Sequence, residues 1–422
     1  MKASTKIFIA ATSCVALVGS LSSCTLSSNS GSSGNKTLTV WTYYSDTGQK
    51  NALSERDAVF EKDNPGWKVN QVQVPFDQMD QKLLAAAQTG NGPDVIANNV
   101  VVDFPSLVGA GVLKDISGEW NGYADKGLFP DSSVWRSNGK VYNVMSYTNL
   151  LGLYGNMDIL AQYGITTMPT TMDDMEAALA KVQAGGKYQG LAEAGAPQVE
   201  GAWLFMPWLL SAGVNYCSLS SHADRVTATY RRIAAWAKNG YIPQAAATWD
   251  QATAWQKFMA GDYAFGLNGN WNLRDAKTNA TFTVTTAQFP TNGGPSVVFP
   301  GGEGLGIFAK SKNAEMAWKY LQTQWLSKDA QVRNFQTSGS VPFRSDATSD
   351  ATLAQDAAAL PFLKATTNVA AWPHNPKTAD MQISIGKAVS ATISGQQTGE
   401  EAAQSAMAGV AAAQKAGGGG CE

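Results

Sequence analysis

The front half of the chain alternates between short β-rich runs and segments with helical spacing. Residues 38–44 and 67–74 carry β-branched and aromatic side chains and are predicted as strands, and residues 92–96 are predicted to start another. Apolar residues at helical spacing predict helices over the ranges between and after them: 49–60, 76–88 and 104–110. Strand and helix taking turns in this way predict a mostly parallel α/β sheet.

The rest of the chain is predicted to be more helical. The predicted helices cover residues 171–182, 199–210, 222–237, 314–326 and 379–414. Further strands are predicted within residues 259–267, 282–288 and 304–309. This order of elements predicts two α/β lobes, with the chain passing between them more than once.

The first 36 residues have a pattern of their own. A short cationic head precedes an apolar stretch that has the length of a signal-peptide core and is too short to span a bilayer. Leu21-Ser22-Ser23-Cys24 resembles the lipobox of bacterial lipoproteins, whose cysteine is lipidated and becomes the new N-terminus. We therefore expect a signal peptide over 1–23 and a flexible tether over 24–36. The alternative is an ordinary secretory signal with an incidental cysteine.

Composition and charge argue for a large globular protein that does not bind nucleic acid. The net charge is −2, and only 15% of the 422 residues are charged. A nucleic-acid partner would call for a basic surface. Tryptophan is common, with 13 residues. The indoles belong either to the core or to a pocket for a ligand with apolar faces.

Two cysteines remain beyond the N-terminal segment, Cys217 and Cys421. An exported chain could pair them. Cys421, however, follows the glycine run 417–420, in a tail over 417–422 that is predicted to be loose. Two unpaired thiols are therefore the favoured prediction.

Motifs for metal, cofactor or nucleophilic catalysis are missing from the sequence. It has two histidines and contains no HExxH, CxxC or Gly-x-Ser-x-Gly pattern. We therefore predict no metal, no cofactor and no catalytic residue. An enzyme that uses a carboxylate pair on glycans remains the alternative, because such pairs cannot be recognised from spacing.

Nearly the whole chain after the tether resembles the bacterial extracellular solute-binding proteins of family 1, the sugar-binding subunits of ABC importers. Each motif alone is modest, and their shared order carries the resemblance. Gly155 interrupts the Tyr-Asn pair that many members have. The motifs in order are 38–44, 92–96 with 107–116, 140–144 through 153–160, 258–266 with 268–271, 310–318 and 339–342.

The resemblance implies an α/β, two-lobe periplasmic-binding-protein-like fold of type II, with about three hinge crossings. The crossings are expected near 146–150, 300–303 and 341–345. The N-terminal lobe would then comprise 37–147 plus 302–343, and the C-terminal lobe 148–301 plus 344–416. Such proteins bind their ligand in the cleft between the lobes, where pockets generally form.

A sugar offers apolar C–H faces and a ring of hydroxyls, so its site needs flat aromatic platforms and planar polar groups. At positions that the resemblance assigns to the cleft, Tyr44 and Asp46 follow the first strand, at the usual ligand edge of an α/β sheet. Asn98 and Asn99 follow the third strand. They are predicted either to bind hydroxyls or to form a turn.

In the second lobe the resemblance implies that Trp271 stacks on sugar, with a core role as the alternative. Trp203 and Trp208 lie five residues apart and so do not share a helical face; one of them is expected in the core. We take Trp208 and Trp249 as ligand contacts.

Two further stretches are expected at the ligand. Gly302 and Glu303 stand at the second crossing, where glycine lets backbone approach a ligand closely. Trp372 and His374 lie in a loop where family members often add an aromatic contact. Arg344 either binds a hydroxyl or pins the third crossing.

The predicted function is an extracellular carbohydrate receptor, for which an oligosaccharide is favoured over a monosaccharide. It would be a monomer anchored by lipid at Cys24 to the outer face of the cell membrane and would deliver sugar to an ABC permease. The identity, linkage and chain length of the sugar do not follow from the sequence.

Overall fold

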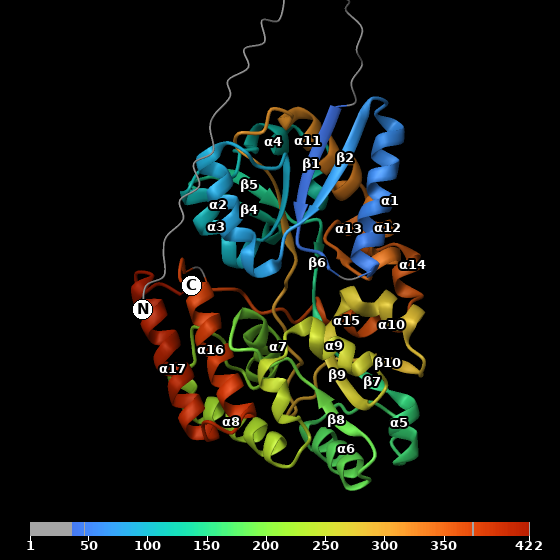
Figure 1. Cartoon of the computed structure of the whole chain (residues 1–422), viewed down its shortest axis with the longest axis vertical. Helices are drawn as coiled ribbons and strands as arrows, with labels where there is room; N and C mark the ends of the chain where they lie inside the picture. The colour runs from blue at the N-terminus through green and yellow to red at the C-terminus, as the bar shows by residue number, and fades with distance from the viewer. Residues whose placement is uncertain (1–35, 46, 374, 422) are drawn as a thin grey trace, which may run out of the picture. The chain divides into compact units, whose positions relative to one another are not determined.

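The computed structural model describes residues 36–45, 47–373 and 375–421 (Figure 1). The predicted signal peptide, the lipobox with Cys24 and nearly all of the tether lie outside these residues, as do Asp46 and His374. In the described part of the chain, no helix combines the length and the apolar character that crossing a membrane requires.

Six strands form the first sheet. In order across it they are β2 (Trp67–Gln73), β1 (Lys36–Thr42), β3 (Val95–Asn99), β11 (Glu303–Ile307), β5 (Lys140–Val144) and β4 (Val134–Ser137). β1 pairs in parallel with β2 and β3, whereas β11 runs antiparallel to β3 and β5. The first four residues of β3 are all buried, as expected of a strand covered on both faces. The predicted order of strands and helices therefore holds, but the prediction of a mostly parallel sheet is wrong: β11 pairs antiparallel with β3 and β5, and β4 pairs antiparallel with β5.

Helices pack on this sheet and complete what we call the first lobe. They are α1 (Thr47–Asp63), α2 (Met79–Thr89), α3 (Val100–Gly109), α4 (Ser117–Gly122) and α11 (Ala314–Leu321), with 3₁₀ turns η1 (Phe76–Gln78), η2 (Lys126–Leu128) and η3 (Asp131–Ser133). α1 contacts β2, α3 contacts β3, and α11 contacts β11. Figure 1 shows these elements around the first sheet.

Four strands form the second sheet. In order they are β10 (Val284–Ala287), β7 (Leu151–Asn156), β9 (Tyr263–Gly269) and β8 (Gln189–Ala192). Every residue of β7 and β9 is buried. The pattern of hydrophobic positions did not predict β7, because glycines interrupt it. A Cβ on Gly152 would stand 2.7 Å from the Phe362 ring, so this glycine allows close packing.

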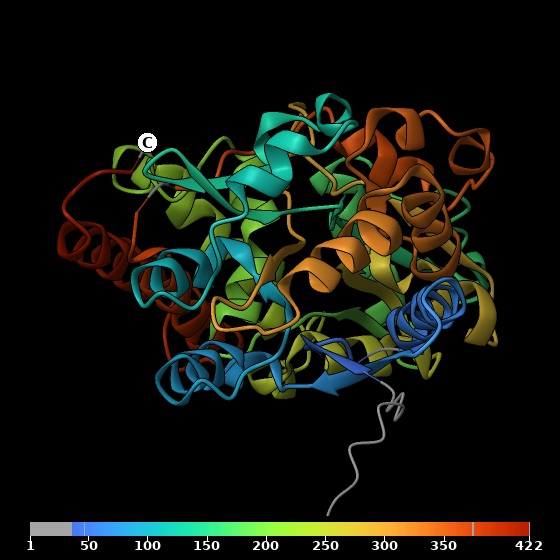
Figure 2. The same ribbon diagram turned by 90° about the horizontal axis from the view of Figure 1, so that it is seen from above.

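The second sheet and its helices form what we call the second lobe. Its α-helices are α5 (Met157–Gln162), α6 (Met172–Ala184), α7 (Val199–Ser211), α8 (Ala223–Lys238), α9 (Gln251–Met259), α10 (Leu273–Asn279), α15 (Leu360–Ala365), α16 (Thr378–Ile393) and α17 (Gly399–Ala416). The 3₁₀ turns are η4 (Ser220–His222), η5 (Gln244–Thr248) and η6 (Asn270–Asn272). In Figures 1 and 2 the red helices α16 and α17 lie together.

The helix predicted over 379–414 is two helices in the structure. The break is a turn at Gly395, whose φ is +73°, a backbone conformation that favours glycine. α17 then begins with a capping box, in which Thr398 and Glu401 each accept from the other's backbone N–H. The helix predicted over 314–326 also ends early, because α11 passes into a π-helical turn at Gln322–Leu326.

Three chain segments lie side by side where the lobes join. β6 (Tyr147–Thr148) pairs antiparallel with β12 (Val341–Pro342). Asn149 and Gly301 exchange two backbone hydrogen bonds, of 2.9 and 2.7 Å. The segments coincide with the three predicted crossings, although the number of hinges stays a prediction.

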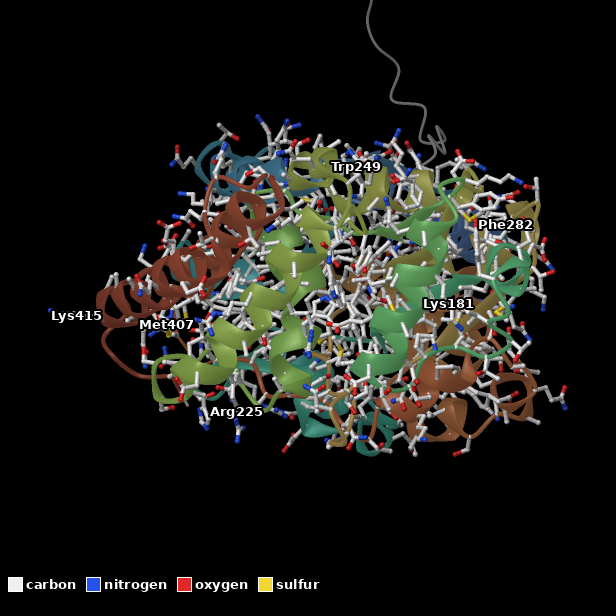
Figure 3. All side chains as sticks on the ribbon, turned by 90° about the horizontal axis from the view of Figure 1, so that it is seen from below. Lys181, Arg225, Trp249, Phe282, Met407 and Lys415 are labelled. Carbon is white, nitrogen blue, oxygen red and sulfur yellow. A yellow bond between two sulfur atoms is a disulfide. The ribbon has the colours of Figure 1, made fainter. Side chains whose placement is uncertain are left out.

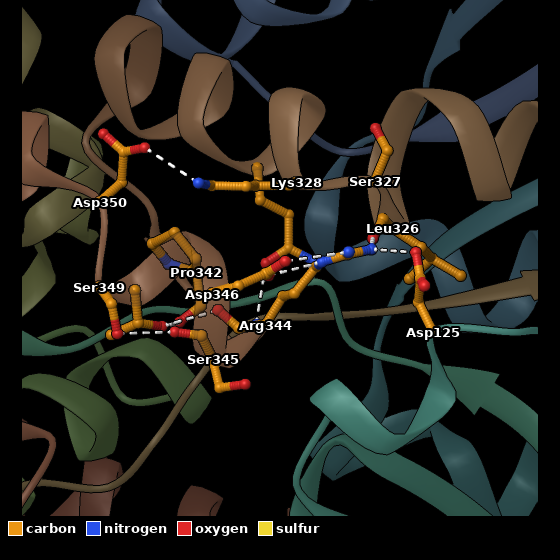
Figure 4. Close-up of polar contacts among 12 residues, drawn as sticks. Asp125, Leu326, Ser327, Lys328, Pro342, Arg344, Ser345, Asp346, Ser349 and Asp350 are labelled. Atoms are coloured by element: carbon orange, nitrogen blue, oxygen red, sulfur yellow. Dashed lines mark hydrogen bonds and ion pairs between the residues drawn. The ribbon is translucent and has the colours of Figure 1, made fainter.

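Arg344 secures the last of these segments. Its Nη1 donates to Asp125 at 2.8 Å and to the carbonyl of Leu326 at 3.2 Å, while Nε donates to Asp346 at 2.7 Å (Figure 4). The side chain is buried and does not line the cavity described below. Of the two predicted roles, the structure therefore supports the second, in which Arg344 holds the third crossing segment in place through its hydrogen bonds. Helix α12 (Lys328–Ser338) precedes this crossing segment, and the short helices α13 (Ser345–Thr348) and α14 (Ala351–Ala354) follow it.

The cysteine prediction is wrong. Cys217 and Cys421 form a disulfide, with their Cα atoms 5.6 Å apart. The glycine run brings Cys421 back to the body of the protein, because Gly418 and Gly419 adopt positive φ values of +96° and +82°.

Candidate ligand-binding site

A cavity of about 450 Å³ is lined by residues of both lobes. The first lobe contributes the loop after β1, the start of α1 and the start of α3. The second lobe contributes α7, α9 and the turn after β9. The crossing segment Gly301–Gly302–Glu303 also lines it. The cavity therefore lies where the strand ends of an α/β sheet and a lobe junction meet, the usual place for a ligand.

Four tryptophans lie on the cavity wall: Trp203, Trp255, Trp271 and Trp372. Trp203 on α7 stacks on Trp372, with ring centroids 5.7 Å apart and ring planes 9° apart. The indole N–H of Trp372 donates to the carbonyl of Pro300 at 2.7 Å, and that of Trp255 donates to Asp275 at 2.6 Å. These bonds fix the orientation of two rings before any ligand arrives.

Trp271 is presented by the turn that ends β9. Gly269 is the last residue of this strand, and a Cβ there would stand 1.8 Å from the Trp271 ring, so only glycine lets the indole lie across the backbone. Asn270 fixes the turn, since its Oδ1 accepts from Leu150 N at 2.6 Å and its Nδ2 donates to Gly339 O at 2.8 Å. The half-buried indole thus has one side on the protein and another on the cavity.

Glu303 joins the cavity to the lobe junction. Its Oε1 accepts from the Tyr43 hydroxyl at 2.9 Å, and its Oε2 accepts from the Tyr147 hydroxyl. Tyr147 also shares a hydrogen bond with Tyr44. Burial raises the pKa of Glu303 above its usual value, and the tyrosine hydrogen bonds offset part of that shift. The carboxyl is thus a fixed anchor for Tyr43, which itself lines the cavity.

Three amide side chains on the cavity wall each have a polar atom without a hydrogen-bond partner in the described chain. Asn149 Oδ1, Gln251 Oε1 and Gln382 Nε2 are buried without a hydrogen-bond partner among residues 36–421 as far as these are described. An unpaired buried donor or acceptor costs about 1–3 kcal/mol. The residues that carry these atoms line the cavity, so the wall suits a ligand that brings both hydroxyl donors and acceptors.

The charge of the wall is one-sided. Its ionisable members include the carboxyl groups of Glu200, Asp275 and Glu303, and the described wall contains no lysine or arginine. Asp275 accepts from Trp255, and Glu200 accepts from Gln251 Nε2 at 2.9 Å. The wall therefore offers polar groups to a neutral ligand, and its described residues include no cation that would attract an anionic one.

The structure brings five of the predicted ligand residues together on the cavity wall: Asn99, Trp271, Gly302, Glu303 and Trp372. Asp46 and His374 lie outside the described residues, so their predictions stay open. Four others lie off this wall: Tyr44, Asn98, Trp208 and Trp249.

Two corrections concern the first lobe. β1 ends at Thr42, so the strand alternation does not extend to the following residues; Tyr43 lines the cavity, whereas Tyr44 is buried beside Tyr147. Asn98 is fully buried within β3 and accepts from Asn143 Nδ2 at 3.2 Å.

Two corrections concern the second lobe. Trp208 is buried in the core and packs edge-on against Trp236, at the border of a second cavity of about 560 Å³. Arg225 lines that second cavity too. Trp249 lies toward the edge of the molecule in the view of Figure 3 and packs edge-on against Tyr263, with the Lys257 ammonium over its ring.

Several wall residues were not among the predicted ligand contacts: Tyr43, Asn149, Glu200, Trp203, Gln251, Trp255, Asn268, Asp275 and Gln382. A signal was available for Trp203. Trp203 lies about 140° around the helix from Trp208, so the two indoles face different surroundings. With Trp208 in the core, Trp203 is the one that reaches the cavity. The amides carried no signal, because their approach depends on how the lobes fold together.

Comparisons with known proteins agree with this architecture. Residues 55–361 match the family model described as bacterial extracellular solute-binding protein. The arabinooligosaccharide-binding protein of Bacillus subtilis is 28% identical over 204 residues, which cover 46% of this chain and 45% of that protein.

Solved structures show the same fold. The GacH receptor of Streptomyces glaucescens, solved unliganded and with acarbose, has a TM-score of 0.76 and 22% identity, covering 90% of this chain and 99% of that one. The maltotriose binding protein of Thermus thermophilus, bound with maltotriose, has a TM-score of 0.75 and 23% identity, covering 90% and 99%. The predicted two-lobe binding-protein fold is thereby confirmed.

Proposed function

Because the chain belongs to the bacterial extracellular solute-binding protein family, we propose that it is a receptor that captures an oligosaccharide in the cavity and delivers it to an ABC import permease. The relatives named above bind arabinooligosaccharide and maltotriose, which supports a sugar of more than one ring. The residues proposed to contact it are those of the wall: the predicted Asn99, Trp271, Gly302, Glu303 and Trp372, together with Tyr43 and Trp203.

The observation that carries this proposal is the pairing of indoles with unsatisfied amides in one cavity. Four tryptophans offer apolar faces, and buried amide atoms of Asn149, Gln251 and Gln382 lack partners in the described chain. A sugar presents C–H faces to the former and hydroxyls to the latter. Its hydroxyls also suit a wall whose ionisable groups include carboxylates and, among described residues, no cation.

The test is a panel of neutral trisaccharides, including maltotriose and arabinotriose, screened by thermal shift and then by calorimetry. A ligand at 100 times its dissociation constant stabilises the folded state by about 2.7 kcal/mol. We expect at least one member to raise the melting temperature and to quench or shift tryptophan fluorescence. Binding by no member would contradict a neutral-oligosaccharide receptor.

The same incubations, analysed by chromatography, test for catalysis. An unchanged sugar after prolonged incubation supports a receptor. Cleavage that is lost in Asp275→Asn or Glu200→Gln would instead favour the glycan-acting enzyme.

The anchor and the location belong to this proposal as well. We infer lipidation at Cys24, a tether that keeps the body at the extracellular face of the cell membrane, and a monomeric receptor. Cys24→Ala should release the protein from the membrane fraction, with Cys217→Ala as a control that stays bound. Retention of the Cys24→Ala variant would contradict the lipobox.

A further inference from the structure

An aromatic stack runs from the cavity wall into the second lobe. Trp203 stacks on Trp372, and Trp372 stacks on Phe299 with centroids 4.1 Å apart and planes 17° apart. Tyr216 completes the stack, 5.6 Å from Phe299 and 6.2 Å from Trp372. Phe299 and Tyr216 are fully buried, whereas the two tryptophans reach the cavity. The position of Trp372 on the wall thus depends on what holds Tyr216 and the loop around residue 372.

The disulfide begins at the next residue after Tyr216. Cys217 sits in a tight turn, in which Asn215 Oδ1 accepts from Cys217 N at 2.9 Å and Ser218 Oγ accepts from Asn215 N at 3.0 Å. Its partner Cys421 lies 204 residues later in the chain. The cross-link therefore ties the C-terminal tail to the base of the aromatic stack.

The same tail holds the loop that carries Trp372. Asn375 Nδ2 donates to the carbonyl of Gln414 at 3.1 Å and to that of Gly420 at 2.6 Å, and the side chain is buried. Asn375 Oδ1 accepts from Lys377 N at 2.8 Å. A Cβ on Gly417 would stand 1.9 Å from Asn375 Oδ1, so the glycine makes this contact possible.

We propose that the Cys217–Cys421 disulfide and the tail contacts of Asn375, together called the tail clamp, position Trp372 on the cavity wall and thereby set ligand affinity from outside the cavity. This inference rests on the proposed sugar site and assigns positioning roles to Asn375 and the two cysteines. None of the three is among the residues that line the cavity.

Two features make the tail clamp more than a generic brace. Cys217 lies one residue from Tyr216 and Asn375 lies three residues from Trp372, and these two rings are neighbours in the stack, with centroids 6.2 Å apart. Within the described chain the Trp372 indole N–H donates to the carbonyl of Pro300, and the rest of its ring is held by stacking and by the loop. Freeing the tail should let the loop around residue 372 sample other positions while the two sheets stay intact.

The first test needs no ligand. Amide hydrogen exchange of residues 370–377 should speed up in Cys421→Ser and in Asn375→Ala relative to wild type, while exchange in β7 and β9 stays unchanged. The matched control is Thr398→Ala, which removes the cap of α17 in the same helix pair but touches neither Asn375 nor the disulfide. Equal exchange of 370–377 in all four proteins would overturn the tail clamp.

The second test measures affinity for the panel trisaccharide with the largest thermal shift. At a temperature where every variant is folded, Cys421→Ser and Asn375→Ala should each weaken binding about tenfold, a typical coupling between distant groups. The double variant should lose little more, because both changes release one unit. Thr398→Ala should bind as wild type does.

Reduction of the wild-type protein repeats the test without a mutation. Dithiothreitol gives two electrons and two protons to the disulfide, which yields two thiols, and is itself oxidised to a cyclic disulfide. Affinity should fall to the Cys421→Ser level and return on reoxidation. Wild-type affinity in both variants and after reduction would overturn the tail clamp and leave the receptor standing, whereas absence of any sugar binding by wild type would count against the receptor itself.

Discussion

At the scale of single residues, Trp271 is the sharpest test of the cavity. A micromolar sugar complex amounts to about 8 kcal/mol, and one aromatic platform carries roughly 2 kcal/mol. Trp271→Ala should therefore weaken binding ~30-fold, as measured by calorimetry, because each 1.4 kcal/mol is a factor of ten. The half-buried indole should leave the unliganded melting temperature almost unchanged.

The control for this variant is Trp67→Ala, which removes another partly buried tryptophan at the start of β2, away from the cavity. It should bind as wild type does. A large loss of stability in Trp271→Ala with normal affinity in the folded fraction would assign Trp271 to the core. A core tryptophan costs about 3–5 kcal/mol when truncated.

Glu193 makes the stability of the second lobe depend on pH. It is buried, and neither of its oxygens accepts a hydrogen bond of normal geometry within the described chain. Burial raises its pKa to about 8, and the nearby Trp208 indole offsets only part of this shift. The folded state thus binds the proton more tightly than the unfolded state, so the stabilisation is complete below the usual pKa of 4.5 and is lost as the pH rises through about 8.

Denaturant unfolding at pH 5 and pH 9 measures this effect. Glu193→Gln should remove roughly 4 kcal/mol of the wild-type loss between these pH values, since pH 5 lies about three units below the folded pKa of about 8 and each unit corresponds to about 1.4 kcal/mol. Burial also raises the pKa of Asp57 and Asp103, so the difference between variant and wild type isolates Glu193. The exposed Glu315→Gln is the control and should keep the wild-type pH dependence. An equal pH dependence in Glu193→Gln would show that this carboxyl stays ionised.

Residue-scale prediction from the sequence succeeded where a motif fixed the local backbone. The run Asn268-Gly269-Asn270-Trp271 indicated an indole at the end of a strand, and the cavity contains it. Prediction failed where a neighbour distant in sequence decides the environment. Tyr44 lies inward, where its hydroxyl shares a hydrogen bond with that of Tyr147, 103 residues away.

At the scale of elements, the turn after β9 links the second sheet to two of the segments that join the lobes. Asn270 is fully buried and bonds both Leu150 and Gly339. Asn270→Ala would leave a buried N–H and a buried C=O unpaired, each worth about 1–3 kcal/mol. We expect about 2–4 kcal/mol of destabilisation in denaturant unfolding.

Asn239→Ala, at the exposed end of α8, is the control and should change stability little. Ligand affinity of the surviving folded Asn270→Ala protein should fall as well, because the same turn presents Trp271. Wild-type stability in this variant would mean that water replaces both bonds without cost.

Element prediction followed the strength of each local signal. Helices with a clear cap were found, as for α6, where Thr171 accepts from Asp174 N at 3.1 Å. β7 was missed because its glycines serve packing against Phe362 and Met168, which a single strand does not reveal. The break between α16 and α17 needed the positive φ of Gly395, which an alanine-rich helical pattern conceals.

At the scale of the whole molecule, the family resemblance supplied what periodicity could not, namely that segments far apart in sequence meet at one junction. The same scale explains the cysteine error. Cys421 follows four glycines and resembles a free tail, yet Asn375, 46 residues earlier, binds that tail and brings it to Cys217. Only the folded chain contains this relation.

Ligand binding should also change the arrangement of the lobes. The wall has residues from both lobes, so a sugar that contacts Tyr43 on one side and Trp271 on the other binds best when the two approach. A ligand favours the arrangement to which it binds more tightly, and a hinge at a few residues permits the motion. Gly302, with φ of +131°, lies at one joining segment and suits such a hinge.

Small-angle scattering with saturating trisaccharide measures this motion. The radius of gyration of wild type should decrease on binding. Trp271→Ala at the same sugar concentration should show a smaller decrease, because its dissociation constant is ~30-fold higher and only part of the variant is bound. Gly302→Ala should reduce affinity, because an L side chain strains the backbone at that φ and a Cβ would stand 2.8 Å from the Tyr147 carbonyl. An unchanged radius in wild type at proven saturation would mean that the sugar enters a preformed site, and affinity would then be set by the wall residues and the tail clamp without lobe closure.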